Sequence, residues 1–350
     1  MWTAARRFNP YHKPLPATKP GFPVNTDHDR ITEMADQTIA VIGLGTMGHG
    51  IAQAFAAAGH TVRCYDESPA ARDSLAGRIE SNLRQRIQAG MDTPDSVRET
   101  LGRITVCGSV REAVAPAGLV TEAVREDLDV KRELFAGMEA IVSRETILAS
   151  NTSSFPMTDI ARDLLHPGRA VVTHWFNPPH IVPLVEVVPG ERTTERTTQT
   201  AVDVLREIGK VPVRLNMELP GFLINRIQVA MQREIWDLLD RGVAGPEDID
   251  RAVRASVGFR LAATGPLSVR DFAGLDVSAL IYRLLVPEIR SDTELPGGIR
   301  KLVDAGHYGV KTGRGFHEYT PESIDRARNR RDRLYLALLN LLCEDEETDE

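Results

Sequence analysis

The 350-residue chain contains only three cysteines and no long apolar run. Cys64, Cys107 and Cys343 lie far apart, which gives neither the spacing of a metal site nor a disulfide framework. We therefore expect no bound metal and a reducing, cytoplasmic setting. No apolar run approaches the roughly 18 residues of a membrane-spanning helix, and the amino end lacks the apolar core of a secretion signal.

The chain also lacks an excess of positive charge. The 42 Lys and Arg residues are outnumbered by 49 Asp and Glu residues, the net charge is -7, and the basic residues are scattered. Nucleic acids and anionic membranes attract basic patches, so we expect neither as a partner. A hydrophobic share of 42% and a charged share of 26% are typical of a globular protein, and the length allows two domains.

The first 36 residues have little that favours a packed element. They carry five prolines, several charges and no hydrophobic periodicity, which predicts a disordered arm over residues 1–36. Met34 lies just before the first expected strand and is a candidate start of translation.

A glycine-rich stretch then organises the chain. The apolar run of residues 38–42 predicts a strand, and it meets Gly43, Gly45 and Gly48 in the G-x-G-x-x-G spacing before an alanine-rich helical stretch. The first glycine allows a tight turn, the second lets a pyrophosphate approach the backbone, and the third lets the helix lie close to the strand. Phosphate groups would bind at the helix N-terminus, where free N–H groups favour negative charge.

A second expected strand, residues 61–65, ends in Asp66. A carboxylate at this point accepts hydrogen bonds from both ribose hydroxyls and repels a 2′-phosphate. The arrangement therefore predicts a dinucleotide site for NAD rather than NADP.

Beyond this stretch, helical and strand patterns alternate as far as residue 215. The segment 68–101 has Leu75, Ile79, Leu83 and Ile87 at a spacing of four, which predicts an amphipathic helix. Alternating strands and helices imply a mainly parallel sheet covered on both faces. We expect a Rossmann-type, doubly wound NAD-binding domain over residues 37–218.

The pattern changes at Pro220, after which there is almost no strand signal. Helices are expected at 222–239, 246–256, 277–289 and 298–305, and a further one at 321–342. We therefore predict an all-helical C-terminal domain over residues 219–320, and a C-terminal helix with an acidic tail over residues 321–350.

The chemistry needs a group that moves a proton while the nicotinamide moves a hydride, and histidine is suited to this role. His174 ends an expected strand, where ligands of open α/β sheets gather, whereas most of the other histidines lie in turns, the glycine-loop helix or the arm. Glu186 lies within an apolar strand and needs a partner. Pairing the two would fix the tautomer of the histidine, but the spacing fits a buried structural histidine and an unrelated salt bridge equally well.

Several motifs, taken in order, resemble the L-3-hydroxyacyl-CoA dehydrogenase family over about residues 37–320. They are the glycine loop with Asp66, Ser-Asn-Thr-Ser-Ser at 150–154, His-Trp-Phe-Asn-Pro-Pro at 174–179, Pro-Leu-Val-Glu-Val-Val at 183–188, Pro-Gly-Phe-Leu-Ile-Asn-Arg at 220–226 and Gly-Val-Lys-Thr-Gly-Arg-Gly-Phe at 309–316. The resemblance implies that His174 is the acid and base, that Glu186 holds it, and that Ser153 and Asn225 bind the reacting oxygen.

The resemblance also implies contacts to NAD. We expect them from Gly43, Leu44, Gly45, Thr46, Met47, Gly48, Asp66, Glu126, Lys131, Asn151, Ser153, Asn177 and Lys311. Without it, Lys131 and Lys311 would be interpreted as solvated surface lysines, and the 150–154 run as a helix N-cap.

The substrate is less clearly indicated. Relatives that use coenzyme A carry serine and lysine on the helix after the second strand, where this chain has Asn82 and Ala89; Arg84 and Arg86 can replace those contacts or form a solvated face. Other stretches look similar to a branch that oxidises a pyridine-carboxylate aldehyde. Arg260 fits either a carboxylate anchor or a helix-end salt bridge.

Three hypotheses result. The first is an NAD-dependent oxidoreductase that interconverts a 3-hydroxyacyl-CoA and a 3-oxoacyl-CoA in fatty acid metabolism, and the second is a dehydrogenase of the same family acting on a small carboxylate-bearing alcohol or aldehyde without coenzyme A. The third, of another class, is a catalytically silent NAD-binding structural protein, against which the presence of all four implied catalytic residues counts. The resemblance also implies that the C-terminal domain over residues 219–320 binds the substrate and forms a homodimer.

Overall fold

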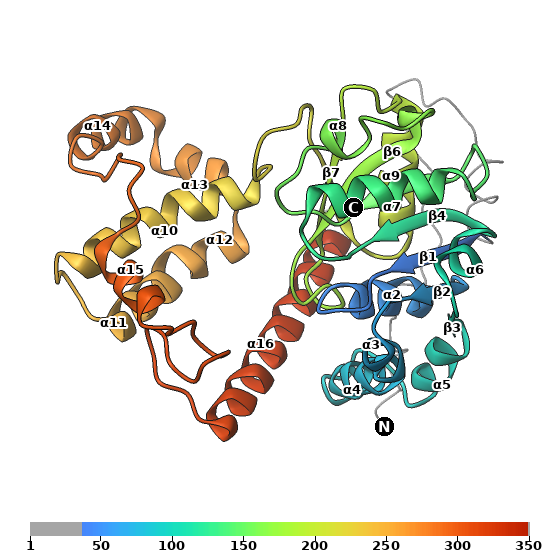
Figure 1. Ribbon diagram of the computed structural model, residues 1–350. Helices are drawn as coiled ribbons and strands as arrows, with labels where there is room; N and C mark the ends of the chain where they lie inside the picture. The colour runs from blue at the N-terminus through green and yellow to red at the C-terminus, as the bar shows by residue number, and fades with distance from the viewer. Residues whose placement is uncertain (1–36, 349–350) are drawn as a thin grey trace. The chain divides into compact units, whose positions relative to one another are not determined.

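An eight-stranded sheet lies at the centre of the first part of the chain (Figure 1). The strands are β1 (Thr38–Ile42), β2 (Val62–Tyr65), β3 (Ile104–Val106), β4 (Ala117–Glu122), β5 (Ile147–Ser150), β6 (Ala170–Trp175), β7 (Leu184–Pro189) and β8 (Val211–Arg214). Their order is β3-β2-β1-β4-β5-β6-β7-β8, and only the β6–β7 pair is antiparallel. The order reverses between β1 and β4, which is where open α/β sheets bind ligands.

The structure is a computed structural model that describes residues 37–348, with side chains for residues 37–342; the predicted arm over 1–36 lies outside the described residues. Two compact units make up the described chain. The first comprises the residues up to Leu223 together with those from Arg333 on, and the second comprises Ile224–Asp332.

Helices cover both faces of the sheet in the first unit. They are α2 (Gly48–Ala57), α3 (Pro69–Asp73), α4 (Leu75–Gln88), α5 (Asp95–Gly102), α6 (Val110–Val114), α7 (Leu128–Glu139), α8 (Met157–Ile160), a short 3₁₀ turn (Pro167–Arg169) and α9 (Glu195–Glu207). Strand β1 shows how the faces are divided, because Ile39 and Val41 belong to one core and Ala40 and Ile42 to the other. The predicted mainly parallel Rossmann-type sheet is confirmed.

Local signals explain several of these helices. Leu75, Ile79 and Leu83 are fully buried along α4, as their spacing of four predicts. Helix α7 begins where the Asp127 carboxylate accepts hydrogen bonds from the N–H groups of Asp129 and Val130, at 3.1 and 3.2 Å. Such a cap satisfies donors that have no partner within the helix.

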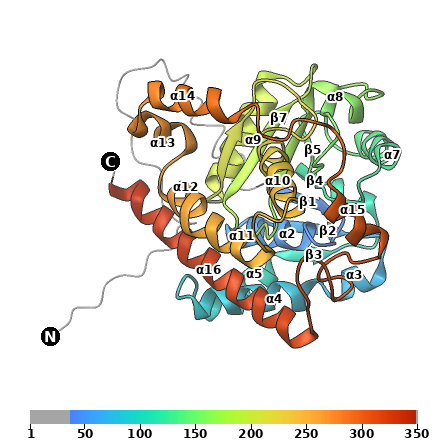
Figure 2. The same cartoon turned by 90° about the vertical axis from the view of Figure 1, so that its left-hand side faces the viewer.

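The second unit is helical. It contains α10 (Ile224–Asp240), α11 (Pro246–Val253), a π-helical turn (Arg254–Gly258), α12 (Phe259–Ala263), α13 (Pro266–Ala273), α14 (Leu275–Leu285), α15 (Gly297–Asp304) and the first part of α16 (Pro321–Thr348). Figure 2 shows these helices and the length of α16, which continues past the predicted end at residue 342. No described helix is long and apolar enough to span a membrane.

Helix α10 begins later than the sequence pattern predicts. The apolar periodicity starts at Phe222, but this residue has a φ of +53°, which is incompatible with a right-handed helix. The preceding Gly221 has a φ of +77°. Two successive left-handed residues therefore delay the helix until Ile224.

The buried Lys210 binds the segment that follows β6. The ammonium of Lys210 donates hydrogen bonds to the carbonyls of Pro179 and Val182, at 2.6 and 3.0 Å, and lies 5.3 Å from the ring centre of Trp175. Burial, and to a smaller extent the nearby Arg86 charge, lower the pKa of Lys210 to about 7.

This burial predicts a pH-dependent stability. Between pH 7 and about 10 the unfolded lysine binds a proton that the folded one does not, so the free energy of unfolding rises with pH by up to about 1.4 kcal/mol per unit. We expect Lys210→Met to lose this slope. Urea unfolding at pH 7, 8 and 9 would show it, and parallel curves for the two proteins would contradict it.

Candidate active site

The glycine turn between β1 and α2 has the geometry of a phosphate cradle. A Cβ on Gly43, whose φ is +91°, would lie 2.6 Å from the carbonyl of Ala123, and one on Gly48 would lie 1.7 Å from the Gly43 oxygen. A Cβ on Gly45 would have nothing within 4 Å. The outer two glycines are therefore required by packing, whereas Gly45 and Thr46 are exposed and leave the turn open to a ligand.

Asp66 joins the end of β2 to this turn. Its carboxylate accepts hydrogen bonds from the N–H of Leu44 at 2.6 Å and from the N–H of Ser68 at 2.8 Å. Arg78, from α4, donates to the carbonyls of Leu44 and Gly45 at 2.7 and 3.2 Å. An open turn at a helix N-terminus, with a carboxylate at the end of the next strand, fits a dinucleotide whose phosphates bind the turn.

His174 and Glu186 are in direct contact. They face each other as paired residues of the antiparallel strands β6 and β7, and His174 Nδ1 lies 2.7 Å from Glu186 Oε2. The histidine is 5% exposed and the glutamate is fully buried. The carboxylate therefore selects the tautomer with the proton on Nδ1, which leaves Nε2 as the basic nitrogen.

Two phenyl rings hold the imidazole. The ring centre of Phe176 lies 4.5 Å from that of His174, and the ring centre of Phe222 lies 5.5 Å from it. Glu186 also has a second partner, because its Oε1 accepts a hydrogen bond from the N–H of Leu223 at 3.1 Å. The buried carboxylate is thus hydrogen-bonded at both oxygens.

The loop after β5 is wrapped around Glu126. One oxygen, Oε1, accepts hydrogen bonds from the Thr152 hydroxyl at 2.6 Å, the Ser153 N–H at 3.0 Å, and the Ser154 N–H and hydroxyl at 3.1 and 2.7 Å. Burial opposes ionisation, but these donors and Lys131 together lower the pKa of Glu126. The serines are exposed beside the end of β6, which neighbours β5 and carries His174.

Lys131 is a buried residue, not a solvated one. It is 1% exposed, and its Nζ lies 2.8 Å from Glu122 Oε1 and 3.3 Å from Glu126 Oε2. Glu122, at the end of β4, is fully buried and also accepts hydrogen bonds from the Ser150 hydroxyl at 2.6 Å and the Val124 N–H at 2.7 Å. The lysine therefore links the strand end to the serine loop.

Other predicted residues have different settings. Asn151 directly follows the carboxyl end of β5, and its Oδ1 accepts a hydrogen bond from the Trp175 N–H at 2.9 Å. Asn177 is exposed and precedes a cis peptide bond to Pro178, and Met47 is the residue before α2. Asn225 and Lys311 belong to the second unit, Asn225 on α10 and Lys311 exposed in the turn region after α15.

Three of the four candidate positions for contacts to coenzyme A, in and just after α4, present no charged group to solvent. Asn82 donates to the Gln53 side chain at 2.9 Å and approaches His180 Nδ1 at 3.4 Å, so its amide is directed inward. Arg86 is 3% exposed and binds Asp92 at 2.7 Å. Ala89 only ends the helix.

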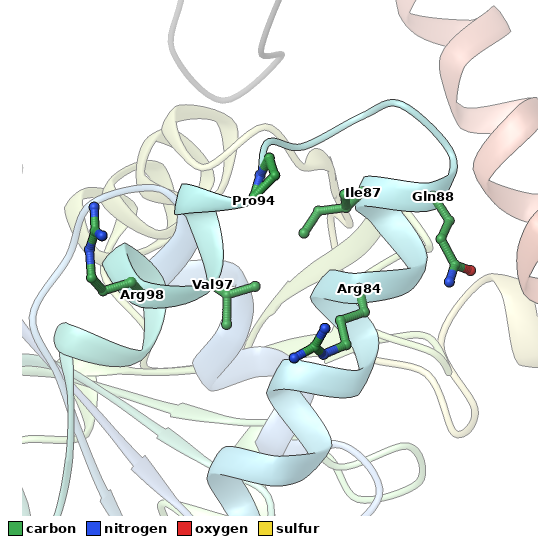
Figure 3. Close-up of a pocket in the computed structure, with 6 residues that line it drawn as sticks. All are labelled: Arg84, Ile87, Gln88, Pro94, Val97 and Arg98. Atoms are coloured by element: carbon green, nitrogen blue, oxygen red, sulfur yellow. The ribbon is translucent and has the colours of Figure 1, made fainter.

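Arg84 lies beside a hollow of about 510 Å³ between α4 and α5 (Figure 3). The hollow is lined by Arg84, Ile87, Gln88, Pro94, Val97 and Arg98. Its two arginines already pair with carboxylates, Arg84 with Glu80 at 2.5 Å and Arg98 with Asp95 at 3.1 Å. Arg84 is the one lining residue considered above, as a candidate contact to coenzyme A, and none of the six is among the predicted catalytic or NAD-binding residues.

Several residues outside the predicted set also shape the site. Glu122 ends an apolar strand, the signal that singled out Glu186, and that signal could have found it. Arg78 and Phe222 have no such signal, because their contacts join elements far apart in the sequence. Arg260, in the second unit, donates hydrogen bonds to the carbonyl and the hydroxyl of Ser256, both at 3.4 Å.

The lysine network predicts a measurable cost. Lys131→Met leaves Glu122 buried without its cation, which should lower the free energy of unfolding by about 3–5 kcal/mol. Lys131→Met combined with Glu122→Gln should recover part of this loss. Urea unfolding of the two single variants and the double variant would test it, and additive losses would contradict the direct pairing.

Comparisons with family models and with known proteins show which family the chain belongs to. Residues 38–218 match the model of the 3-hydroxyacyl-CoA dehydrogenase NAD binding domain, and residues 221–319 match that of the C-terminal domain. The chain is 34% identical over 306 residues to 5-formyl-3-hydroxy-2-methylpyridine 4-carboxylate 5-dehydrogenase of Mesorhizobium japonicum, covering 87% of this chain and 98% of the relative. It is 37% identical over 287 residues to a probable 3-hydroxybutyryl-CoA dehydrogenase of Bacillus subtilis, covering 82% and 98%.

Solved structures give the same result. A crystal structure of the pyridine-carboxylate dehydrogenase, described as an NAD⁺-dependent dismutase, matches with a TM-score of 0.82 at 34% identity and covers 88% of this chain and 98% of that one. The 3-hydroxybutyryl-CoA dehydrogenase of Escherichia coli matches with a TM-score of 0.67 at 37% identity, covering 81% and 60%. The chain therefore belongs to the 3-hydroxyacyl-CoA dehydrogenase family, and it is an NAD-dependent oxidoreductase.

Proposed function

We propose that His174 is the general acid and base of a dehydrogenase reaction, and that Glu186 orients its imidazole and stabilises the imidazolium form. The observation that carries this proposal is the 2.7 Å contact between His174 Nδ1, near the end of β6, and Glu186 Oε2, near the start of β7. In the oxidative direction, Nε2 of His174 takes the hydroxyl proton of the substrate, and the Glu186 carboxylate stabilises the imidazolium that forms. Bound NAD supplies the acceptor for the hydride that leaves the same carbon.

The remaining predicted residues have supporting roles. Ser153 binds the substrate oxygen from a loop that Glu126 fixes through its four hydrogen bonds. The glycine turn holds the pyrophosphate, and Asp66 receives the ribose hydroxyls. Asn225, Asn177 and Lys311 remain predictions from the family resemblance, for the substrate oxygen in the first case and for NAD in the other two.

His174→Gln tests this role. The amide keeps a polar group in place but cannot accept the proton, so kcat should fall roughly 10²- to 10⁴-fold while NADH binding, followed by fluorescence, is largely kept. Glu139→Gln, in a buried ion pair with Arg169 outside the predicted site, is the matched control and should keep kcat. Unchanged turnover of His174→Gln would remove the proposed role.

For the substrate, we propose a small carboxylate-bearing alcohol or aldehyde without coenzyme A. The state of α4 supports this choice, since Asn82 points inward and Arg86 is buried against Asp92, where neither faces a coenzyme A nucleotide. The pyridine-carboxylate dehydrogenase, with its TM-score of 0.82, also favours it.

A 3-hydroxyacyl-CoA is the second candidate. It is favoured by the identity of 37% to the probable 3-hydroxybutyryl-CoA dehydrogenase of B. subtilis and by the exposed Arg84–Glu80 pair, which a phosphate could replace at little cost. This candidate would place the enzyme in fatty acid metabolism.

The two substrates can be separated directly. NADH loss or formation at 340 nm is followed with acetoacetyl-CoA and with 5-formyl-3-hydroxy-2-methylpyridine 4-carboxylate, alongside other aromatic aldehyde carboxylates and small keto acids. We expect kcat/KM to be at least about tenfold higher for an aldehyde carboxylate, a difference of about 1.4 kcal/mol in transition-state binding. A preference for acetoacetyl-CoA would favour the second candidate.

We also propose a homodimer formed through the helical unit. Helices α13 and α14 expose large apolar side chains, among them Leu267, Phe272, Leu280, Tyr282 and Leu284. Apolar surface of this extent supports a protein interface.

The small number of cysteines supports a cytoplasmic setting.

A further inference from the structure

Phe222 has an unusual backbone for a bulky residue. Its φ of +53° is the only positive value among the non-glycine residues that the structure describes. Side chains with a Cβ are strained in this region, and such residues persist only where the surrounding structure determines them. Glycine would adopt the same backbone without strain, so the side chain itself is needed at this position.

The Phe222 ring lies against the proposed acid and base. It is 1% exposed, and its centre lies 5.5 Å from that of the His174 imidazole at an interplanar angle of 54°. This separation and tilt are typical of favourable contacts between aromatic rings. With Phe176 at 4.5 Å, the ring restricts where the imidazole can turn.

The backbone after Phe222 lies against the partner of that histidine. The N–H of Leu223 donates to Glu186 Oε1 at 3.1 Å, while Oε2 of the same carboxylate holds His174. The N–H of Phe222 is bound in a turn to the Leu219 carbonyl at 2.9 Å. The left-handed residue therefore ends a turn and directs the next amide towards the carboxylate.

We propose that Phe222 is a positioning residue for the reaction, whose ring fixes the His174 imidazole and whose left-handed backbone presents the Leu223 amide to Glu186. The inference rests on the proposed role of His174. Packing of the core does not require this backbone, because a residue with an ordinary, unstrained backbone can place a ring there. The proposed role explains why Phe222 is left-handed. The residue acts through His174 and Glu186 and need not touch the substrate.

Phe222→Leu and Phe135→Leu form a matched pair. Both phenylalanines are buried in the same apolar core, and Phe135 has no ring contact with His174. Each change removes a ring and keeps an apolar side chain, so both variants should lose thermal stability. Only Phe222→Leu should lower kcat, by roughly 10- to 100-fold, because a small displacement of the acid and base slows proton transfer. NADH binding should stay within about twofold in both.

A second measurement does not depend on the substrate. Diethyl pyrocarbonate modifies accessible imidazoles, and tandem mass spectrometry can follow the modification at His174. Loss of the covering ring should speed this modification in Phe222→Leu but not in Phe135→Leu. Phe222→Gly, which takes the left-handed backbone freely, should be as slow in turnover as Phe222→Leu and more thermostable than Phe222→Ala.

The outcomes separate the two proposals. If His174→Gln keeps full turnover, the proposed function fails, and so does the positioning role that rests on it. If His174→Gln is slow but Phe222→Leu matches Phe135→Leu in kcat and in the modification of His174, only the role of Phe222 is overturned. A selective loss of kcat with faster modification of His174 supports both.

Discussion

The site depends on one buried carboxylate. Glu186 is fully buried, and a charge in that setting is tolerated only when its oxygens are hydrogen-bonded. One oxygen binds His174, and the other binds the N–H of Leu223 at the end of the first unit. The same group therefore orients the imidazole and anchors the segment that leads to α10. A change that removes it would disturb both at once.

A second buried network supports the neighbouring strand ends. Lys131 lies between Glu122 and Glu126. Glu126 in turn accepts hydrogen bonds from hydroxyl and N–H groups of the loop over residues 152–154. The glycine turn and this loop follow the carboxyl ends of β1 and β5, and His174 lies near the carboxyl end of β6. Because the parallel strands all end at one edge of the sheet, separate stretches of sequence reach a common site.

Much of this could be predicted from local patterns. The glycine spacing, the acid at residue 66 and the alternation of strands and helices predict the Rossmann-type sheet, and the spacing of apolar residues predicts the buried face of α4. The contact between His174 and Glu186 follows from a different argument, namely that a carboxylate in an apolar strand needs a partner. Helix α10 begins at Ile224, later than the periodicity predicts, because apolar periodicity carries no information on the left-handed backbone of Phe222.

The sequence by itself determined the fold class, the NAD cofactor and the family, because each depends on short-range spacing of glycines, acids and apolar residues. Only the tertiary structure decided that Lys131 is buried between two carboxylates, that Arg86 is bound to Asp92, and that Phe222 lies against His174. These contacts depend on side chains meeting between separate elements and on the burial that results. Residue type and local spacing do not specify either property.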